Sequence, residues 1–264
     1  MNEFVAPRKS LGQNFLQDPN IINKIVASLN VQKSDVVVEI GPGRGALTEL
    51  IMPLAEQLHL VEFDRDLVRY WQAREAESLI VHGQDILQFD LMQIIQAAST
   101  KIKVIGNLPY NISSPVLFYL RKYAQHIDSQ IVMLQKEVVE RMASKPGSKQ
   151  YGRLSVMLQQ RYAIEYLFTV PPTAFYPPPK VESAIARLSP LQQVAHPVDK
   201  PEVFAKVVKQ AFSMRRKTLR NNLKGLLDVG QIESLEIDPG ARAERLSVGD
   251  FAALSNLYSS LLDF

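Results

Sequence analysis

The tetrapeptide Asn107-Leu108-Pro109-Tyr110 could hold an amino group and a flat ring at one place. The side-chain carbonyl of Asn107 and the backbone carbonyl of Leu108 can accept both N–H bonds of an exocyclic amine such as that of adenine. These fixed dipoles would favour a pyramidal nitrogen and stabilise the charge that develops as it reacts. Pro109 fixes the turn, and Tyr110 offers a face on which an extruded base can stack. We therefore expect these four residues to be the catalytic part of a site.

A glycine turn at 41–45 follows a buried apolar run and precedes a helical pattern. Glycines let the backbone turn sharply and approach a nucleotide-type ligand closely. Glu62 ends the next apolar run, 21 residues after Gly41, where its carboxylate could accept hydrogen bonds from two ribose hydroxyls. Residues 41–46 also satisfy the dinucleotide pattern G-x-G-x-x-A, so this element alone leaves NAD and S-adenosylmethionine both open.

Two further features bear on the choice of cofactor. Asp85 follows the third apolar run and could receive an adenine amino group, although by itself it is equally suited to cap a helix. A dehydrogenase gives no role to residues 107–110, which favours S-adenosylmethionine. Methyl transfer would depend mainly on holding the sulfonium methyl and the amine nitrogen in line, at roughly 3–3.5 Å. It needs no metal and no strong base, because the proton can leave after the nitrogen has become cationic.

Short apolar runs alternate with amphipathic stretches and predict the elements that position these residues. Buried strands are expected at 36–40, 58–63, 79–82, 104–107 and 130–134. Helical periodicity lies between them, for example at 47–54 and 67–71. This alternation predicts an α/β fold with a doubly wound, mostly parallel, Rossmann-like sheet. Ligands bind such sheets at the carboxyl ends of the strands, where the glycine turn, Glu62 and residues 107–110 fall.

The later part of the chain changes character. Residues 155–167 and 183–188 predict further strands, and the proline clusters near 171 and 177 predict ordered loops. Beyond about residue 191 only helical patterns remain, over 201–227, 231–236 and 248–262. We expect a cofactor-binding catalytic domain over 1–190 and a small all-helical domain over 191–264.

Composition sets outer limits on function. The 264 residues are 46% hydrophobic and 22% charged, as in an ordinary enzyme. No cysteine is present, which excludes disulfides and thiolate metal sites and is compatible with a reducing cytoplasm. There is no signal-peptide pattern and no apolar run long enough to cross a membrane. We expect a monomeric cytoplasmic protein that uses neither a metal nor a membrane.

In combination, these motifs resemble those of the ribosomal RNA adenine dimethyltransferase family, most of all its bacterial small-subunit members, whose loss confers kasugamycin resistance. The resemblance runs nearly end to end and is carried by residues 9–16, 39–45, 61–66, 107–115, 175–183 and 215–223. It implies dimethylation of the N6 amines of two adjacent adenosines in a hairpin loop near the 3′ end of 16S rRNA. The implied partner is that rRNA within a precursor of the small ribosomal subunit.

Carried over position by position, the resemblance implies that S-adenosylmethionine contacts Asn14, Leu16, Gly41, Glu62, Asp85 and Asn107. It also implies that the N-terminal segment closes over the cofactor and that Phe175 is a second aromatic wall for the base. Within this class, a large-subunit rRNA enzyme or a DNA adenine methylase is the alternative. Outside this class, an RNA-binding assembly factor or a transcription cofactor could use the same scaffold. An active enzyme is favoured by four intact residues: Glu39, Glu62, Asp85 and Asn107.

Charge is segregated within the expected helical domain. Residues 200–227 carry eight basic side chains and one acidic one, whereas 228–264 carry two basic and seven acidic ones. Drawn as one helix, six cations fall within an arc of about 100°: Lys206, Lys209, Arg216, Lys217, Arg220 and Lys224. Such a face is often merely solvated, but beside the motifs above it favours contact with RNA phosphates. The expected RNA-binding residues are Lys209, Arg216, Lys217, Arg220 and Lys224.

Overall fold

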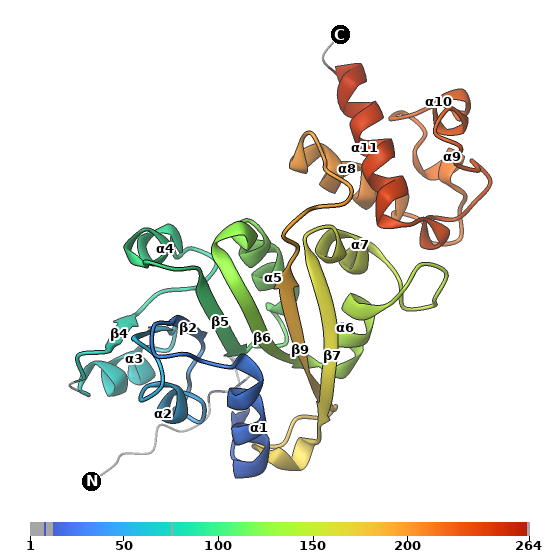
Figure 1. Cartoon of the computed structure of the whole chain (residues 1–264). Coiled ribbons are helices and arrows are strands. Elements are labelled where there is room, and N and C mark those ends of the chain that lie inside the picture. The colour runs from blue at the N-terminus through green and yellow to red at the C-terminus, as the bar shows by residue number, and fades with distance from the viewer. Residues whose placement is uncertain (1–7, 9–12, 75, 263–264) are drawn as a thin grey trace. The chain divides into compact units, whose positions relative to one another are not determined.

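The computed structural model describes residues 8, 13–74 and 76–262 (Figure 1). The chain divides into two compact units. The first comprises Met1–Val139 and Ile164–Pro190, and the second comprises Glu140–Ala163 and Leu191–Phe264. Within the described ranges, no helix has the length and apolar character needed to cross a membrane.

A seven-stranded sheet with the order β4-β3-β2-β5-β6-β9-β7 forms the framework of the first unit. Its strands are β2 (Val36–Ile40), β3 (Gln57–Val61), β4 (Leu79–His82), β5 (Ile102–Asn107), β6 (Ile127–Gln135), β7 (Tyr162–Val170) and β9 (Ser183–Pro190). β2 to β6, the five strands that the apolar runs predict, pair in parallel, and β9 pairs antiparallel with β6. The fold is the expected doubly wound, mostly parallel α/β arrangement.

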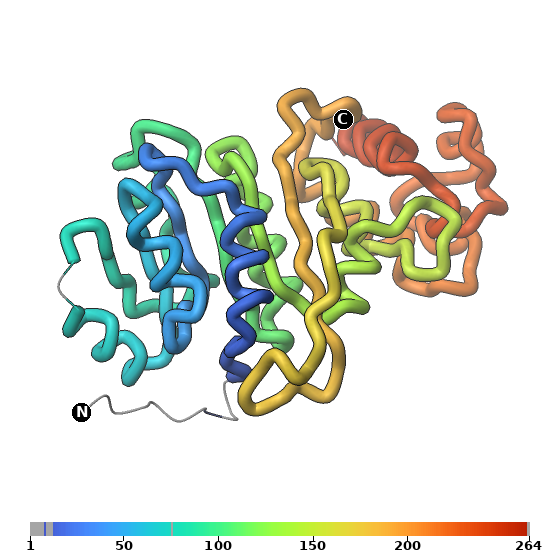
Figure 2. The backbone as a smooth tube through the Cα atoms, turned by 60° about the horizontal axis from the view of Figure 1, so that its bottom comes forward, coloured from blue at the N-terminus to red at the C-terminus, as the bar shows by residue number. Residues whose placement is uncertain are grey.

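Apolar side chains on the sheet faces hold the helices in place. The helices between the strands are α1 (Pro19–Leu29), α2 (Thr48–Ile51), α3 (Arg65–Gln72), α4 (Met92–Ala97), α5 (Ser113–Arg121) and α6 (Lys136–Ala143). Val37, Ile105 and Ile131 of the sheet share one core cluster with Ile25 and Leu29 of α1, and Figure 2 shows α1 lying across this face. Every residue of β2 is buried, as expected for a central parallel strand.

Residues 155–167 were expected to form one strand, but the first part of this range is helical. α7 (Arg153–Gln159) precedes β7. Ser155 Oγ accepts a hydrogen bond from the N–H of Gly152 at 3.1 Å and so satisfies a backbone donor at the helix start. A short buried apolar run looks the same in a helix and in a strand, which is why the pattern at 156–158 was misread.

The second unit is largely helical and includes residues 140–163, which fall within the range 1–190 expected for the first domain. α7 packs against α8 (Pro201–Ala211) and α11 (Val248–Leu262). Two short helices, α9 (Leu219–Asn222) and α10 (Val229–Glu233), lie between α8 and α11 in the sequence. Phe204 and Phe251 are fully buried in this core. The rings of Phe212 and Phe251 stack with their centroids 5.5 Å apart.

The basic stretch 201–227 is not one helix, so the prediction of one helix with its cations on a single continuous face is wrong. α8 ends at Ala211, and α9 begins only at Leu219. Asn222, which is 1% exposed, accounts for the break. Its side-chain amide donates to the carbonyls of Ala211 at 2.6 Å and Met214 at 3.1 Å, in place of the backbone donors of a continuing helix. The cations therefore lie on α8, on α9 and in the loops around them.

Candidate functional site

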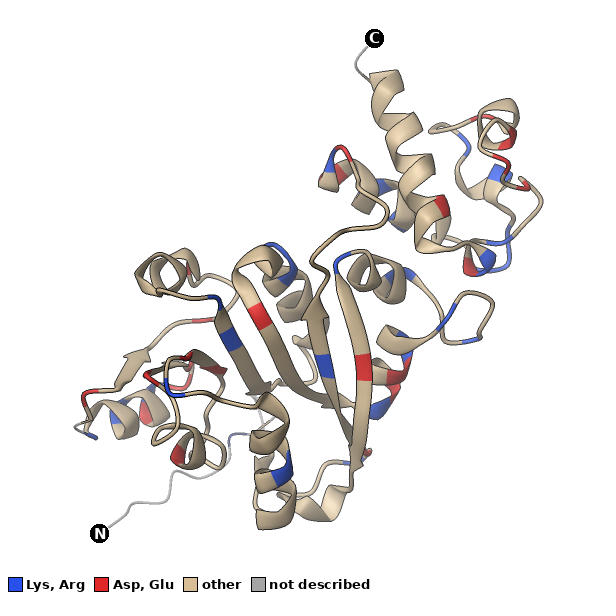
Figure 3. Cartoon of the chain, viewed as in Figure 1, with Lys and Arg blue, Asp and Glu red and all other residues tan. Residues whose placement is uncertain are grey.

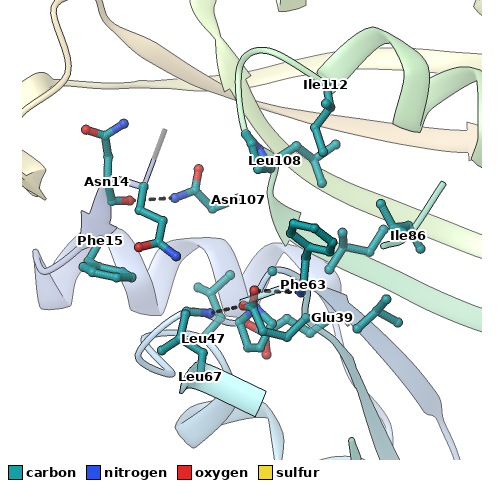
Figure 4. A pocket seen from close by; sticks show the side chains of 18 of the residues that line it. Asn14, Phe15, Glu39, Leu47, Phe63, Leu67, Ile86, Asn107, Leu108 and Ile112 are labelled. Atoms are coloured by element: carbon teal, nitrogen blue, oxygen red, sulfur yellow. Dashed lines mark hydrogen bonds between the residues drawn. The ribbon is translucent and has the colours of Figure 1, made fainter. Parts of the chain in front are cut away.

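A cavity of about 260 Å³ lies in the first unit, at the carboxyl ends of β2, β3 and β5. Figure 4 shows Asn14 and Asn107 on one side of this cavity and Phe63 and Ile86 on the other. Among its lining residues are Asn14, Leu16, Gly41, Glu62, Asp85, Asn107, Leu108, Pro109 and Tyr110. The fold thus brings together the residues expected to contact the cofactor and those expected to do the chemistry.

Backbone geometry explains the glycines of the turn after β2. Gly41, Gly43 and Gly45 have φ angles of +66°, +55° and +90°, which residues with a Cβ atom rarely adopt. A Cβ on Gly45 would also stand 2.5 Å from the ring of Trp71. The indole N–H of Trp71 donates to the carbonyl of Gly43 at 2.9 Å. α3 therefore fixes the shape of the turn.

Backbone donors hold the carboxylate of Glu62 just beyond β3. Its Oε1 accepts hydrogen bonds from the N–H groups of Phe63 and Asp64, each at 2.9 Å, and its Oε2 accepts from Gly43 at 3.3 Å. Burial raises the pKa of Glu62 above its ordinary value, and the three N–H donors act in the opposite direction. The acid and the glycine turn are thus one hydrogen-bonded unit on the cavity wall.

Asp85 lines the cavity from the segment that follows β4. Its Oδ1 accepts a hydrogen bond from the N–H of Leu87 at 3.0 Å, and its carbonyl accepts from Gln88 and Phe89. It therefore starts a turn. This local role is compatible with a ligand contact, because a carboxylate has a second oxygen.

The amide of Asn107 is oriented by the N-terminal segment. Its Nδ2 donates to the backbone carbonyl of Asn14 at 3.1 Å (Figure 4). Since the nitrogen is engaged there, Oδ1 is the atom left to accept a hydrogen bond from a ligand. The next residue is fixed by the sheet, because the N–H of Leu108 donates to the carbonyl of Met133 on β6 at 3.1 Å.

Tyr110 lines the same cavity and is held at both ends. Its phenol oxygen lies 2.7 Å from Ser183 Oγ, and Ser113 Oγ donates to its backbone carbonyl at 3.1 Å. Burial raises the pKa of the Tyr110 phenol, so this group is neutral at physiological pH. Tyr110 thus presents an uncharged ring to the cavity.

Phe175, the expected second aromatic wall, does not line the cavity. Its side chain is 4% exposed and packs in the apolar core. It pairs with Leu16 in a small antiparallel sheet formed by β1 (Phe15–Leu16) and β8 (Phe175–Tyr176). Alternation along β8 turns Phe175 inward and leaves Tyr176 55% exposed. In this structure, therefore, Phe175 offers no face to a base.

The N-terminal segment borders the cavity through residues 13–16. Gln13 Nε2 donates to Asp64 Oδ2 at 2.9 Å, and Arg8 forms ion pairs with Asp64, at 3.1 Å, and with Asp66. The guanidinium carbon of Arg44 lies 4.4 Å from the centroid of the Phe15 ring. These contacts tie the segment to the glycine turn and to the turn after Glu62. Residues 9–12 of the motif lie outside the described residues.

Glu39, whose presence favours an active enzyme, is a buried acid in the cavity wall. Thr48 Oγ1 donates to its Oε2 at 2.7 Å. Burial raises the pKa of Glu39 to about 8, against the effect of this hydrogen bond, and the nearby Glu62 raises it further. Phe63 and Ile86 also line the cavity and were missed in the sequence analysis. Their only sign in the sequence is that each directly follows an acid singled out above.

The histidines lie outside this cavity. Across the described part of the chain, no group of three His, Cys, Asp or Glu side chains could hold a metal ion. His59 on β3 and His82 on β4 form a pair instead, with Nδ1 and Nε2 3.0 Å apart. Burial lowers the pKa of His59 to about 4, so this ring is neutral at pH 7.

Comparisons with known proteins place these residues in a family context. A family model described as ribosomal RNA adenine dimethylase matches residues 5–260. The chain is 48% identical over 251 residues to the ribosomal RNA small subunit methyltransferase A of Chromobacterium violaceum, and the match covers 95% of each chain. It is 50% identical over 251 residues to the protein of the same name from Janthinobacterium sp. (strain Marseille), over 95% of this chain and 98% of the relative.

A solved structure agrees with the sequence matches. A dimethyladenosine transferase from Plasmodium falciparum superposes with a TM-score of 0.77 at 25% sequence identity. The superposition covers 91% of this chain and 95% of that one. The likeness therefore extends over both units of the chain.

Proposed function

Because the chain belongs to the ribosomal RNA adenine dimethylase family, we propose that it transfers methyl groups from S-adenosylmethionine to the N6 amines of two adjacent adenosines. The proposed substrate is a hairpin loop near the 3′ end of 16S rRNA, in a precursor of the small ribosomal subunit. One observation carries the proposal: the amide of Asn107 and the carboxylate of Glu62 line one cavity, at the ends of the two strands that flank β2. We expect the protein to act as a monomer in the cytoplasm.

The surroundings of the glycine turn suit this cofactor, which supplies an electrophilic methyl group when bound. The carboxylate of Glu62 would accept hydrogen bonds from the two ribose hydroxyls, and Asp85 would accept one from the adenine amine. Phe63 and Ile86, beside these acids in the cavity wall, would contact the faces of the adenine ring. Asn14, Leu16 and Gly41 would complete the contacts to the cofactor.

Residues 107–110 would hold the target base. Asn107 Oδ1 and the Leu108 carbonyl would accept the two N–H bonds of the amine, whose lone pair is otherwise delocalised into the ring. They favour a pyramidal nitrogen and stabilise the positive charge that develops on it. Pro109 fixes the turn, and Tyr110 stacks on the base. As the N–C bond formed, the C–S bond of the cofactor would break, and the cationic nitrogen would then lose its proton to water. These residues would therefore act mainly by positioning.

Cations of the second unit suit the phosphates of the RNA (Figure 3). The five expected contacts are all exposed: Lys209, Arg216, Lys217, Arg220 and Lys224. The side chain of Arg215 bonds the carbonyl of Lys149 and lies 3.6 Å from the carboxylate of Glu244. Within this unit, the loop 144–152, which carries Lys145 and Lys149 and precedes α7, therefore meets the loop between α8 and α9. Both loops would approach the RNA backbone, and binding should weaken as salt rises.

The proposal is tested by transfer of labelled methyl groups to small-subunit particles from cells that lack this activity. We expect two methyl groups on each of two adjacent adenosines, located by nuclease digestion and mass spectrometry. If the purified protein binds S-adenosylmethionine but leaves every adenine of the particle unmodified, the proposal fails. Label found only in large-subunit rRNA or only in DNA would mean that the protein is a large-subunit rRNA enzyme or a DNA adenine methylase instead.

A further inference from the structure

We infer that Ser183 is a positioning residue for this reaction: its hydroxyl group holds the phenol of Tyr110, so that the ring is a fixed wall of the base site. The inference rests on the proposed function, because it assigns Tyr110 the task of receiving an adenine. Ser183 itself does not line the cavity. It would act only through Tyr110.

The position of the Ser183 hydroxyl is set by the sheet. Ser183 is the first residue of β9 and pairs with Gln135 of β6 in the antiparallel ladder. Its side chain is 0% exposed, so water does not compete for the hydroxyl. Its Oγ lies 2.7 Å from the phenol oxygen of Tyr110, the usual distance for a hydrogen bond between two hydroxyls. The Ser183 hydroxyl is therefore fixed in position and shielded from water.

The main chain of Tyr110 is anchored separately. Ser113, the buried first residue of α5, donates from its Oγ to the Tyr110 carbonyl at 3.1 Å. One serine thus fixes the backbone and the other fixes the tip of the side chain. A swing of the ring about the Cα–Cβ bond would break the contact to Ser183. The two contacts together hold the ring in one rotamer.

A fixed ring matters to the rate more than to the binding of RNA. Phosphate contacts dominate affinity for a nucleic acid, so a freed ring should leave the KM for particles nearly unchanged. The reacting nitrogen, however, must be in line with the methyl group, and a base that stacks on a mobile ring spends less time there. The loss should therefore appear in kcat. A neutral hydrogen bond of this kind corresponds to roughly a 2- to 10-fold effect.

The test is a cycle of four proteins: wild type, Ser183→Ala, Tyr110→Phe and the double variant. Each single variant should lower kcat by roughly 2- to 10-fold, with the KM for small-subunit particles and the affinity for S-adenosylmethionine unchanged. Since both changes remove the same hydrogen bond, the double variant should be no slower than the slower single variant. Tyr110→Phe leaves β9 intact, so the inference can be tested even if Ser183→Ala folds poorly.

The first unit contains a matched control. The hydroxyls of Tyr166 and Thr169 on β7 are also 2.7 Å apart, and neither residue lines the cavity. Tyr166→Phe should keep the wild-type kcat. Equal losses in Tyr166→Phe and Ser183→Ala, or single-variant losses that multiply in the double variant, would overturn the inference. The inference is also overturned if the wild type is active and both single variants keep its kcat. If the wild type itself transfers no methyl groups, the proposed function fails and this inference fails with it.

Discussion

Glu39 places a carboxyl group inside the cavity wall, where the hydroxyl of Thr48 is its hydrogen-bond partner. Because burial raises its pKa from 4.5 to about 8, the folded protein holds a proton at pH 7 that the unfolded chain releases. The stability that this group contributes is therefore complete below pH 4.5 and is lost as the pH rises through 8. A cationic ligand in the cavity would favour the carboxylate and lower this pKa.

Replacing Glu39 by Gln should remove this pH dependence, because an amide keeps an acceptor for Thr48 and does not ionise. Between about pH 5 and pH 8, the free energy of unfolding of Glu39→Gln should rise relative to wild type, by at most about 1.4 kcal/mol per pH unit. Urea unfolding across this range measures the difference, with the exposed Glu56→Gln as control. Parallel curves for wild type and Glu39→Gln would show that the carboxyl is not held neutral.

The polar residues of the cavity could be predicted because each ends a strand or lies within three residues of the end of one. Glu62, Asp85 and Asn107 are polar side chains at the carboxyl ends of apolar runs, where parallel sheets place ligands. The role inferred for Ser183 could not be predicted, since it depends on a contact across 73 residues. That Phe175 lies in the core and not at the cavity could not be predicted either, because the motif does not show which face of a two-residue strand is buried.

At the scale of elements, the strands were predictable and the basic helix was not. A parallel strand inside a sheet is a continuous apolar run. The five apolar runs became β2 to β6, of which β4, at the sheet edge, is only half-buried. Across 213–218 the helical spacing continues in the sequence although the helix has ended. Where α8 ends, the buried side-chain amide of Asn222 donates hydrogen bonds to the carbonyls of Ala211 and Met214. Such a tertiary contact leaves no periodic signal.

Asn222→Ala should destabilise the second unit, because the carbonyls of Ala211 and Met214 lose their donor inside the core. Loss of these buried hydrogen bonds should lower the free energy of unfolding by about 2–4 kcal/mol. The neighbouring Asn221 offers a control, since it is exposed and its side chain donates to the Thr218 hydroxyl. Chemical denaturation of the two alanine variants would compare them. Equal stabilities would contradict the role given to Asn222.

At the scale of the whole molecule, the net charge of +3 conceals a separation of sign. Residues 200–227 are strongly basic, and residues 228–264 are acidic. The basic side chains of residues 200–227 lie on α8, on α9 and in the loops around them. RNA affinity and cofactor binding should therefore be separable by substitution, because the cofactor cavity belongs to the first unit.

Charge reversal at Arg216 and Arg220 should weaken binding to small-subunit particles about 10-fold or more and lower the salt dependence of binding. The affinity for S-adenosylmethionine should not change. Reversal at Lys101 and Lys122, two exposed lysines of the first unit, alters the net charge equally and serves as control. Unchanged methylation of particles by the Arg216/Arg220 variant across a salt series would contradict the assignment.

Single-turnover methyl transfer by Asn107→Ala, with particles and S-adenosylmethionine both saturating, tests the central claim most directly. The truncated residue cannot accept the N–H bond of the target amine, and loss of one such preorganised contact predicts a rate at least about 100-fold lower. Cofactor affinity is measured separately, because Asn107 also lines the cofactor cavity. A rate within tenfold of wild type would mean that the amine is not held at residue 107.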